Sequence, residues 1–313
     1  MAYKAQYTKD RFQGERVIVT GGASGIGLAI ATSFACLGAR VAVVDVNKGL
    51  LDEAVAAIGN SATGYVCDVS SWSAQCELFE KVTSTTGAPT IVCLNAGVDP
   101  ELAISNPRSS AECKKLVRYN YLAHELDVKE CNDNGPPRLK QPPTTIFDVN
   151  FYGVLYGIKL ASYYMRENGG RIIVTGSAAS YIGFPHQDVY VASKHALLGL
   201  VRATANRRQN TTATTGKVTL SMLAPWLTDT PLTRANSLFE GIKSTPQSST
   251  PSDVARAVLR LSAMEPDLCH GRCLWVRGNT TLEVEEAYEK WVGKLGKLAP
   301  EGGDAGNPTL SKL

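Results

Sequence analysis

Residues 16–31, RVIVTGGASGIGLAIA, are the stretch that decides the fold of this chain. The β-branched run RVIVT favours a buried strand, and the apolar positions of LAIA begin a helical pattern. Between them Gly21, Gly25 and Gly27 stand in the spacing G-x-x-x-G-x-G. Glycine permits a tight turn and lets another group come close to the backbone at the start of a helix. The stretch therefore predicts a strand, a tight turn and a helix in succession.

The same alternation of short apolar runs and longer helical patterns continues along the chain. Further strands are expected at 40–46, 63–69, 90–95, 171–177, 217–224 and 272–278. Helices are expected at 25–37, 48–58, 72–86, 145–168, 188–207, 251–264 and 281–295. Strands that are apolar almost throughout are typical of parallel sheets buried on both faces. We expect an α/β protein, a single-domain Rossmann fold whose seven-stranded parallel sheet is doubly wound, with helices on both faces.

One domain is expected over residues 1–298, because no change of composition marks a second one. Residues 98–145 are long for a connection and contain NDNGPPRLKQPP, a run rich in turn-forming residues. A segment of this length is an insertion that covers a pocket, extends an interface or loops out. Residues 299–313 contain few apolar side chains, so a flexible tail is expected.

The composition is that of an ordinary soluble protein. Of 313 residues, 44% are hydrophobic and 19% charged, and the net charge is +3. So mild a charge does not favour nucleic acid or an anionic membrane as a partner. No run of signal-peptide or membrane-spanning length occurs, so the eight cysteines are expected to be reduced thiols inside a cell. CHGRC at 269–273 is too weak a pattern to predict a metal site.

The glycine-rich turn predicts a site for the diphosphate of a dinucleotide, because free N–H groups at a helix start attract anions. Asp45 ends the second expected strand, eighteen positions after Gly27. Its carboxylate can accept hydrogen bonds from ribose hydroxyls and would repel a 2′-phosphate, which favours NAD over NADP. Lys48 weighs against this preference, and the alternative role of Asp45 is to cap the next helix.

The stretch VYVASKHAL at 189–197 places Tyr190 and Lys194 one helical turn apart on the same face. A phenol is a poor base at neutral pH, and a fixed positive charge nearby lowers its pKa. The pair can therefore serve as a device for proton transfer.

Taken together, the motifs resemble those of the short-chain dehydrogenase/reductase family over residues 15–280. Within that family the chain is most similar to NAD-dependent 15-hydroxyprostaglandin dehydrogenases. The resemblance rests on TGGASGIG (20–27), CDV (67–69), LNAG (94–97), VNFYG (149–153), VTGSAAS (174–180), YVASK (190–194) and PWLTDT (225–230).

The resemblance implies a catalytic tetrad. Tyr190 would be the general base in oxidation and the general acid in reduction. Lys194 would lower the pKa of Tyr190 and bind the nicotinamide ribose. Ser177 would hold the substrate oxygen, and Asn150 would fix a water that connects Lys194 to solvent. Ser177 as a helix cap and Asn150 as a core polar group are the alternatives.

The resemblance also implies the residues that contact NAD. They are Gly21, Ser24, Gly25, Ile26, Gly27, Asp45, Asp68, Val69, Asn95, Ala96, Gly97, Tyr190, Lys194, Pro225, Leu227 and Thr230. Two positions depart from the family pattern. Leu94 stands where the family has an asparagine, and Trp226 stands where it has a glycine. The ring of Trp226 either lines the substrate pocket or packs under the loop.

Ser177, Gln187, Tyr190 and Trp226 are the expected substrate contacts. The segments YIGFPHQ (181–187) and PLTRANSLFEGI (231–242) are largely apolar, which suits a bulky lipophilic secondary alcohol or its ketone, terpenoids and polyketides included. We expect an NAD-dependent alcohol dehydrogenase. An NADPH-dependent ketoreductase, a dinucleotide-sensing protein without redox activity and a cyclase or isomerase on the same fold are the alternatives.

A homodimer or homotetramer through helices 145–168 and 188–207 is implied by the same resemblance. Ser311, Lys312 and Leu313 form the tripeptide read by the peroxisomal import receptor. A peroxisomal location is therefore expected, with the cytoplasm as the alternative.

Overall fold

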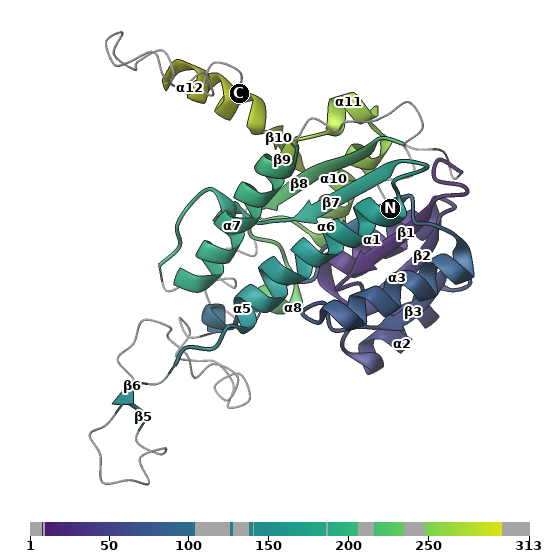
Figure 1. The fold of residues 1–313 in the computed structure, drawn as a ribbon, viewed down its shortest axis with the longest axis horizontal. Helices are drawn as coiled ribbons and strands as arrows, with labels where there is room; N and C mark the ends of the chain where they lie inside the picture. The colour runs from purple at the N-terminus through teal and green to yellow at the C-terminus, as the bar shows by residue number, and fades with distance from the viewer. Residues whose placement is uncertain are drawn as a thin grey trace.

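The structure is a computed structural model that describes residues 8, 10–103, 126–127, 138–139, 141–185, 187–205, 216–234 and 248–295. At its centre lies an eight-stranded sheet in the order β10-β9-β8-β7-β4-β1-β2-β3 (Figure 1). Its strands are β1 (Arg16–Thr20), β2 (Arg40–Asp45), β3 (Ala62–Val66), β4 (Ile91–Leu94), β7 (Gly170–Thr175), β8 (Val218–Pro225), β9 (Cys273–Arg277) and β10 (Thr280–Glu283). The seven expected strands are all present and mutually parallel.

The order of the strands reverses beside β1. The chain first builds outward from β1 to β2 and β3, and then returns to place β4 on the other side of β1. Parallel sheets bind ligands in the crevice that such a reversal opens at the carboxyl ends of the strands. The glycine-rich turn follows β1 and LNAG ends β4, so both motifs lie at this crevice.

Helices cover both faces of the sheet, as expected for a doubly wound fold. α1 (Gly25–Cys36), α2 (Lys48–Ile58) and α10 (Pro251–Ala263) pack in one core, and α3 (Trp72–Thr86), α6 (Gly153–Tyr164) and α7 (Asp188–Ala205) in the other. Alternating side chains of a strand point to opposite faces. Val17 and Val19 of β1 accordingly enter the first core, and Ile18 enters the second. The Rossmann-type fold is confirmed.

Local signals explain where several helices begin. The side chain of Asn47 accepts the N–H of Leu50 at the start of α2, and Ser71 accepts that of Ala74 at the start of α3. At α10, Thr250 and Asp253 form a reciprocal capping box. These side chains satisfy N–H groups that have no partner within the helix.

The sheet was predicted to have seven parallel strands. The structure adds an eighth strand, β10, at one edge. β10 pairs antiparallel with β9 across the two-residue loop 278–279. Gly278 has φ +57°, and such a glycine in a two-residue loop makes a tight hairpin. The helix predicted at 281–295 therefore begins only at Glu285, as α12 (Glu285–Leu295).

The helix predicted at 145–168 is divided and shorter. It begins as α5 (Thr145–Phe147), widens into the π-helical turn η3 (Asp148–Tyr152) and continues as α6, which ends at Tyr164. Such π-helical turns occur frequently at functional sites. Asn150 lies in this turn. α7 follows the prediction from Asp188 to Ala205, and residues 206–207 lie outside the described part of the chain.

The smaller elements are η2 (Pro100–Ala103), η4 (Ala178–Ser180), α8 (Pro231–Arg234) and α11 (Pro266–Cys269). β5 (Leu126–Asp127) and β6 (Arg138–Leu139) form a separate two-stranded antiparallel sheet. Most of the predicted insertion 98–145 and the whole tail 299–313, with Ser311, Lys312 and Leu313, lie outside the described residues. None of the described helices is long and apolar enough to span a bilayer.

Candidate active site

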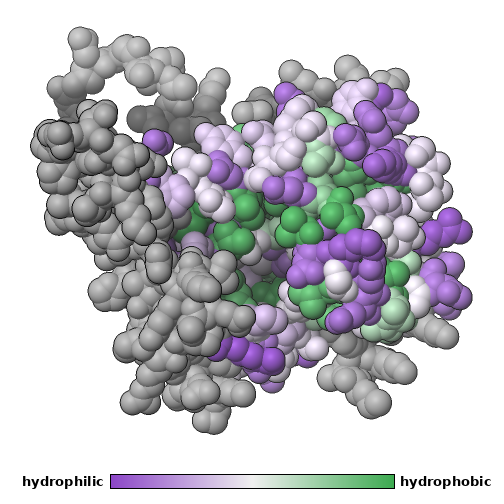
Figure 2. All heavy atoms as spheres, turned by 90° about the horizontal axis from the view of Figure 1, so that it is seen from below, coloured by the Kyte–Doolittle hydropathy of each residue, from purple (hydrophilic) through white to green (hydrophobic). Residues whose placement is uncertain are grey.

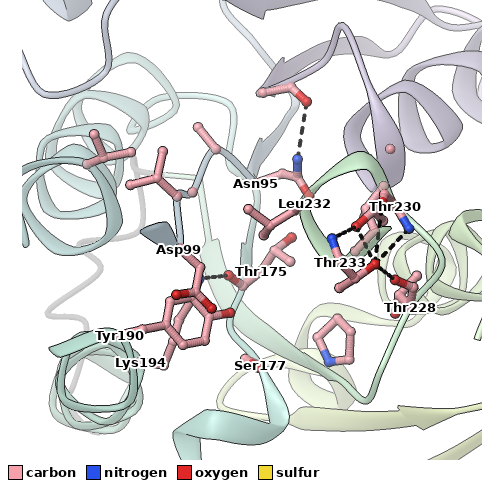
Figure 3. A pocket seen from close by; sticks show the side chains of 18 of the residues that line it. Asn95, Asp99, Thr175, Ser177, Tyr190, Lys194, Thr228, Thr230, Leu232 and Thr233 are labelled. Atoms are coloured by element: carbon pink, nitrogen blue, oxygen red, sulfur yellow. Dashed lines mark hydrogen bonds between the residues drawn. The ribbon is translucent and has the colours of Figure 1, made fainter. Parts of the chain in front are cut away.

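A cavity of about 680 Å³ opens at the crevice beside β1 and β4. Its volume is typical of a ligand-binding cleft. Gly21, Gly25 and Asp45 line it, and so do Ser177 and Tyr190 (Figure 3). The predicted cofactor turn and the predicted catalytic residues therefore share one cavity.

The backbone at the glycine-rich turn needs glycine. Gly21 and Gly25 have φ of +62° and +50°, which side chains rarely tolerate. A Cβ on Gly21 would lie 2.9 Å from Cα of Ala96, and one on Gly27 would lie 1.9 Å from the oxygen of Gly21. Gly27 does not line the cavity. It lets α1 pack against the turn from behind, so its part in cofactor binding is indirect.

Asp45 is held rigidly at the carboxyl end of β2. Its Oδ2 accepts the N–H of Ala23 at 3.2 Å, and its Oδ1 accepts the N–H of Asn47 at 3.0 Å. Because Asn47 caps α2, the alternative that Asp45 is that cap is wrong. Lys48 pairs with Asp52 at 2.7 Å. The carboxylate of Asp45 thus lines the cavity while the nearby lysine is engaged elsewhere.

The end of β4 is tied to the glycine-rich turn through Thr20. Its Oγ1 accepts the N–H groups of Asn95 and Ala96 at 3.0 and 3.1 Å, and Asn95 Nδ2 donates to the oxygens of Thr20 and Gly21. The other residues predicted to contact the cofactor also line the cavity: Ser24, Ile26, Asp68, Val69, Gly97, Pro225, Leu227 and Thr230. The structure thus brings together every predicted cofactor residue except Gly27.

Tyr190 and Lys194 project from α7 into the cavity, with the Lys194 Nζ 5.6 Å from the centroid of the tyrosine ring. The ammonium donates to the oxygen of Thr175 at 3.3 Å. Removal from water lowers the pKa of Lys194 to about 8, and the charge of Asp99 acts in the opposite direction. Tyr190 and Lys194 therefore lie on one face of α7, as the sequence predicts.

The predicted lowering of the Tyr190 pKa is not found in the structure. Desolvation raises this pKa well above its ordinary value, and the charge of Asp99 raises it further. The hydrogen bond with Ser177 lowers it, though not enough to reverse the direction. The physical reason is that a desolvated phenolate beside a carboxylate is unfavourable. The raised pKa means that the side chain of Tyr190 is a protonated phenol at neutral pH.

Ser177 follows β7 and has the helix-cap role that was the alternative, while its contact with a substrate oxygen stays a prediction. Its Oγ accepts the N–H of Ala179 at 3.1 Å, within a capping box with Ser180 that begins η4. It also lines the cavity and hydrogen-bonds with Tyr190. The cap holds the hydroxyl at the position where a substrate oxygen would meet it.

Asn150 is fully buried and joins three segments. Its Oδ1 accepts the N–H of Val98 at 2.8 Å, and its Nδ2 donates to the oxygen of Val98 at 2.9 Å and to the Oγ of Ser193 at 3.2 Å. Asn150 does not line the cavity. The π-helical turn thus fixes the loop after β4 to the catalytic helix, while the water-holding role stays a prediction.

Trp226 both lines the cavity and packs behind it. Its ring stacks on Trp275 with centroids 5.7 Å apart and lies 6.0 Å from the ring of Phe184. Its backbone N–H donates to the oxygen of Val276 at 2.7 Å. The ring thus borders the cavity and packs on the end of β9, and its contact with a substrate stays a prediction.

The comparison with known proteins agrees with this geometry. A model of the short chain dehydrogenase family matches residues 15–132 and 139–240. The chain belongs to the short-chain dehydrogenase family. It is 31% identical over 301 residues to a 5′-hydroxyaverantin dehydrogenase of Dothistroma septosporum, with 90% of each chain covered. The resemblance seen in the motifs is confirmed, and the family places the chain among its oxidoreductases.

Other relatives of this short-chain dehydrogenase differ in what their names state. An NADP-dependent dehydrogenase of Phoma sp. is 31% identical over 228 residues, covering 69% of this chain and 60% of its own. A (+)-cis,trans-nepetalactol synthase of Nepeta racemosa is 31% identical over 263 residues, covering 82% of each. The crystal structure of a 3-ketoacyl-(acyl-carrier-protein) reductase from Brucella melitensis with NADH has the same fold, with a TM-score of 0.66 and 22% identity over 84% of this chain and 97% of its own.

Two buried carboxylates at the site of this dehydrogenase were missed from the sequence. Asp99 lines the cavity and accepts a hydrogen bond from Nε2 of Gln187. Glu101 accepts the N–H groups of Val189 and Tyr190 at 3.2 and 2.7 Å, where α7 begins. Their position directly after LNAG, at the carboxyl end of a buried strand, was the signal available. Their partners lie 88 and 89 residues further along the chain, which no local pattern reveals.

The pattern CHGRC has a structural explanation. Both ring nitrogens of His270 are engaged, because Nδ1 accepts the N–H of Leu220 at 3.1 Å and Nε2 lies 2.9 Å from the oxygen of Ala205. Cys269 and Cys273 are buried. In the described part of the chain, no group of three or more His, Cys, Asp or Glu residues is arranged to hold a metal ion.

Proposed function

We propose that this short-chain dehydrogenase uses NAD to transfer a hydride between the cofactor and a lipophilic secondary alcohol or its ketone. The proposal rests on one observation: a single cavity contains both sets of predicted residues. Asp45 and the glycine-rich turn line one part of it, and Ser177, Tyr190 and Lys194 line another. A group bound along that cavity would bring its reactive end to the proton-transfer residues.

The residues at the turn fit a dinucleotide whose adenosine ribose carries no 2′-phosphate. Gly21 and Gly25 keep the approach to the start of α1 open, because a Cβ on Gly21 would collide with Ala96. Asp45 is oriented by two backbone N–H groups, and it presents a carboxylate to hydroxyl donors. Lys48, the cation that could have neutralised it, pairs with Asp52. A 2′-phosphate would meet an unscreened negative charge, which supports NAD.

The bound nicotinamide supplies or accepts the hydride. In oxidation the carbon of the alcohol loses its hydrogen as hydride, the hydroxyl proton passes to Tyr190, and a carbonyl forms. Ser177 hydrogen-bonds with the oxygen throughout, and Lys194 stabilises the phenolate. In reduction Tyr190 returns its proton to the oxygen. The raised pKa of Tyr190 suits its role as an acid in reduction, and in oxidation the positive charge of Lys194 would favour the phenolate.

The walls of the cavity support a lipophilic substrate. Phe184, Pro185, Trp226 and Leu232 line it beside the catalytic residues. Seen from the side on which α8 lies in Figure 1, hydrophobic side chains gather in a hollow of the surface (Figure 2). Apolar walls with a few polar groups are typical of pockets for small lipophilic molecules.

The first test is a fluorescence titration of the protein with NADH and, in parallel, with NADPH. NADH is expected to bind more tightly. The Tyr190→Phe variant is expected to retain NADH binding and to lose at least 100-fold in alcohol turnover, because a general acid–base group contributes about that much or more. Tighter binding of NADPH would instead support an NADPH-dependent ketoreductase; the name of the Phoma relative states NADP dependence.

A second candidate is a cyclisation or isomerisation in the same cavity. The relative named nepetalactol synthase favours keeping it. Wild-type protein that binds NADH, oxidises no alcohol and reduces no ketone, but converts a carbonyl compound into its isomer without change in NADH, would support this candidate over the dehydrogenase.

A homodimer or homotetramer through the α6 side is also proposed. Trp72, Tyr152 and Tyr163 are exposed, at 41%, 44% and 58%, on α3, η3 and α6. Exposed aromatic side chains of this kind are enriched at protein interfaces. Light scattering would give the mass in solution. The peroxisomal location stays a prediction that rests on Ser311, Lys312 and Leu313.

A further inference from the structure

Asp99 introduces a negative charge into an otherwise largely apolar part of the cavity. It lies in the loop after β4, is only 6% exposed and lines the cavity. Gln187, which precedes α7, donates its amide Nε2 to the Asp99 carboxylate. Figure 3 shows Asp99 extending from the loop after β4 toward Tyr190 and Lys194.

The charge of Asp99 reaches both proton-transfer residues. After desolvation it is the next cause that raises the pKa of Tyr190, and it opposes the lowering of the Lys194 pKa. The carboxylate therefore lies near the place where the reacting oxygen of a substrate would meet Tyr190. Retaining a carboxylate at such a place is unfavourable unless donors satisfy it.

An ionised carboxylate accepts hydrogen bonds and donates none. A ketone or ether oxygen next to Asp99 would gain nothing from it, and a second carboxylate would be repelled. A hydroxyl or phenol would donate to it in a charge-assisted hydrogen bond, which is stronger than a bond between neutral groups. The Gln187 amide orients the acceptor and fixes its position beside the reacting centre.

We propose that Asp99, held by Gln187, recognises a second hydroxyl group next to the reacting carbon, so that the substrates are neutral lipophilic diols and hydroxyketones and not carboxylate-bearing alcohols. This inference rests on the proposed function, since it names the substrate class of the same site. Gln187 was expected to contact the substrate itself, and here it also acts through Asp99.

Three probes with one reacting carbon separate the alternatives: 1-phenylethanol, 1-phenyl-1,2-ethanediol and mandelate carry a methyl, a hydroxymethyl and a carboxylate group beside the carbinol. With NAD, the wild type is expected to favour the diol over 1-phenylethanol by about tenfold or more in kcat/KM, and to use mandelate least. In Asp99→Asn the preference for the diol is expected to fall severalfold and the relative rate with mandelate to rise. The exposed Asp267→Asn, on α11 and outside the lining of the cavity, serves as the matched control and should keep the wild-type order.

Equal ratios in the wild type and Asp99→Asn, or a wild-type preference for mandelate, would overturn the inference. Oxidation of none of the three probes by the wild type would count against the proposed function instead. In that case a binding measurement tests the role of Asp99 independently of turnover. With NADH present, 2-hydroxyacetophenone should raise the Tm of the wild type more than acetophenone or phenylglyoxylate does. The same Tm order in Asp99→Asn contradicts the inference whatever the turnover. NADH titration of the variant shows that its cofactor site is folded.

Discussion

At the scale of single residues, cofactor recognition depends on how the fold positions the charged side chains of Asp45 and Lys48. Asp45 is oriented toward the cavity by Ala23 and Asn47, while Lys48 is drawn to Asp52. Both residues were visible in the sequence, but their separate partners were not. The proposed preference for NAD over NADP rests on this separation.

Replacing Asp45 with alanine should therefore change the cofactor preference. The ratio of the NADPH and NADH dissociation constants is expected to fall about 10- to 100-fold, because a like-charge contact with the 2′-phosphate is removed. Fluorescence titration measures both constants. Lys48→Ala is the control, and an equal effect of the two variants would refute Asp45 as the discriminating residue.

Lys194 predicts a pH dependence of cofactor binding. Burial lowers its pKa to about 8, so its amino group is mostly charged below pH 8 and mostly neutral above it. Hydrogen bonds from an ammonium to ribose hydroxyls are stronger than those from a neutral amine. The NADH dissociation constant should be flat below pH 8 and rise above it, by at most about tenfold per pH unit.

Titrations between pH 6.5 and 9.5 check this dependence. In Lys194→Met the rise should disappear, because no group remains there to lose a proton. A rise of the same size in that variant would assign the effect to another residue.

At the scale of elements, the catalytic helix α7 is fixed by a residue from another part of the chain. Both oxygens of Glu101, in η2, accept backbone N–H groups of the first turn of α7, including that of Tyr190. Glu101 is only 2% exposed. It thus supplies a cap that α7 does not need to carry in its own sequence, and it couples the loop after β4 to the position of Tyr190.

Removing this cap should loosen α7. Glu101→Ala is expected to lower the free energy of unfolding by about 1–3 kcal/mol, because two buried N–H groups lose their acceptor. kcat should fall while NADH affinity changes little. Urea unfolding and steady-state kinetics measure the two effects, and Glu101→Gln should recover part of both. The exposed Glu77→Ala is the control; if it matched Glu101→Ala, the cap would have no special role.

At the scale of the whole molecule, a cluster of contacts connects α12 to the wall of the cavity. Glu285, at the start of α12, accepts hydrogen bonds from Nε and Nη2 of Arg202 at 2.7 and 3.1 Å and from the hydroxyl of Tyr181 at 2.6 Å. The ring of Tyr181 lies 5.9 Å from that of Trp275, which stacks on Trp226. Through these contacts α12 supports the wall of the cavity that Trp226 lines, which is the proposed substrate side.

Glu285→Ala should consequently weaken alcohol binding more than NADH binding. It should also lower the free energy of unfolding by about 2 kcal/mol or more, because a largely buried ion pair loses one partner while Arg202 keeps some contact with water. Chemical unfolding and kinetics measure these effects. The neighbouring Glu286, which pairs with Lys290 on the surface, supplies the control Glu286→Ala, for which less than 1 kcal/mol is expected. Equal losses in the two variants would remove the role assigned to Glu285.

The sequence by itself determined the parts of this protein that depend on local patterns. Glycine spacing after a β-branched run set the turn at Gly21, and apolar runs set seven parallel strands, because backbone freedom and side-chain periodicity are properties of a few adjacent residues. The helical interval between Tyr190 and Lys194 likewise placed both on one face. The π-helical turn and the Gly278 hairpin were missed, since both depend on weak local signals that packing decides.

Only the tertiary structure decided which distant groups meet and how much water they keep. The contacts of Asp99 with Gln187 and of Glu101 with the start of α7 join segments almost 90 residues apart, and no periodicity links them. The packing of Trp226 on Trp275 is of the same kind. The raised pKa of Tyr190 follows from desolvation and from Asp99, both consequences of packing. Burial and long-range contact are properties of the folded chain, and the details of this site depend on them.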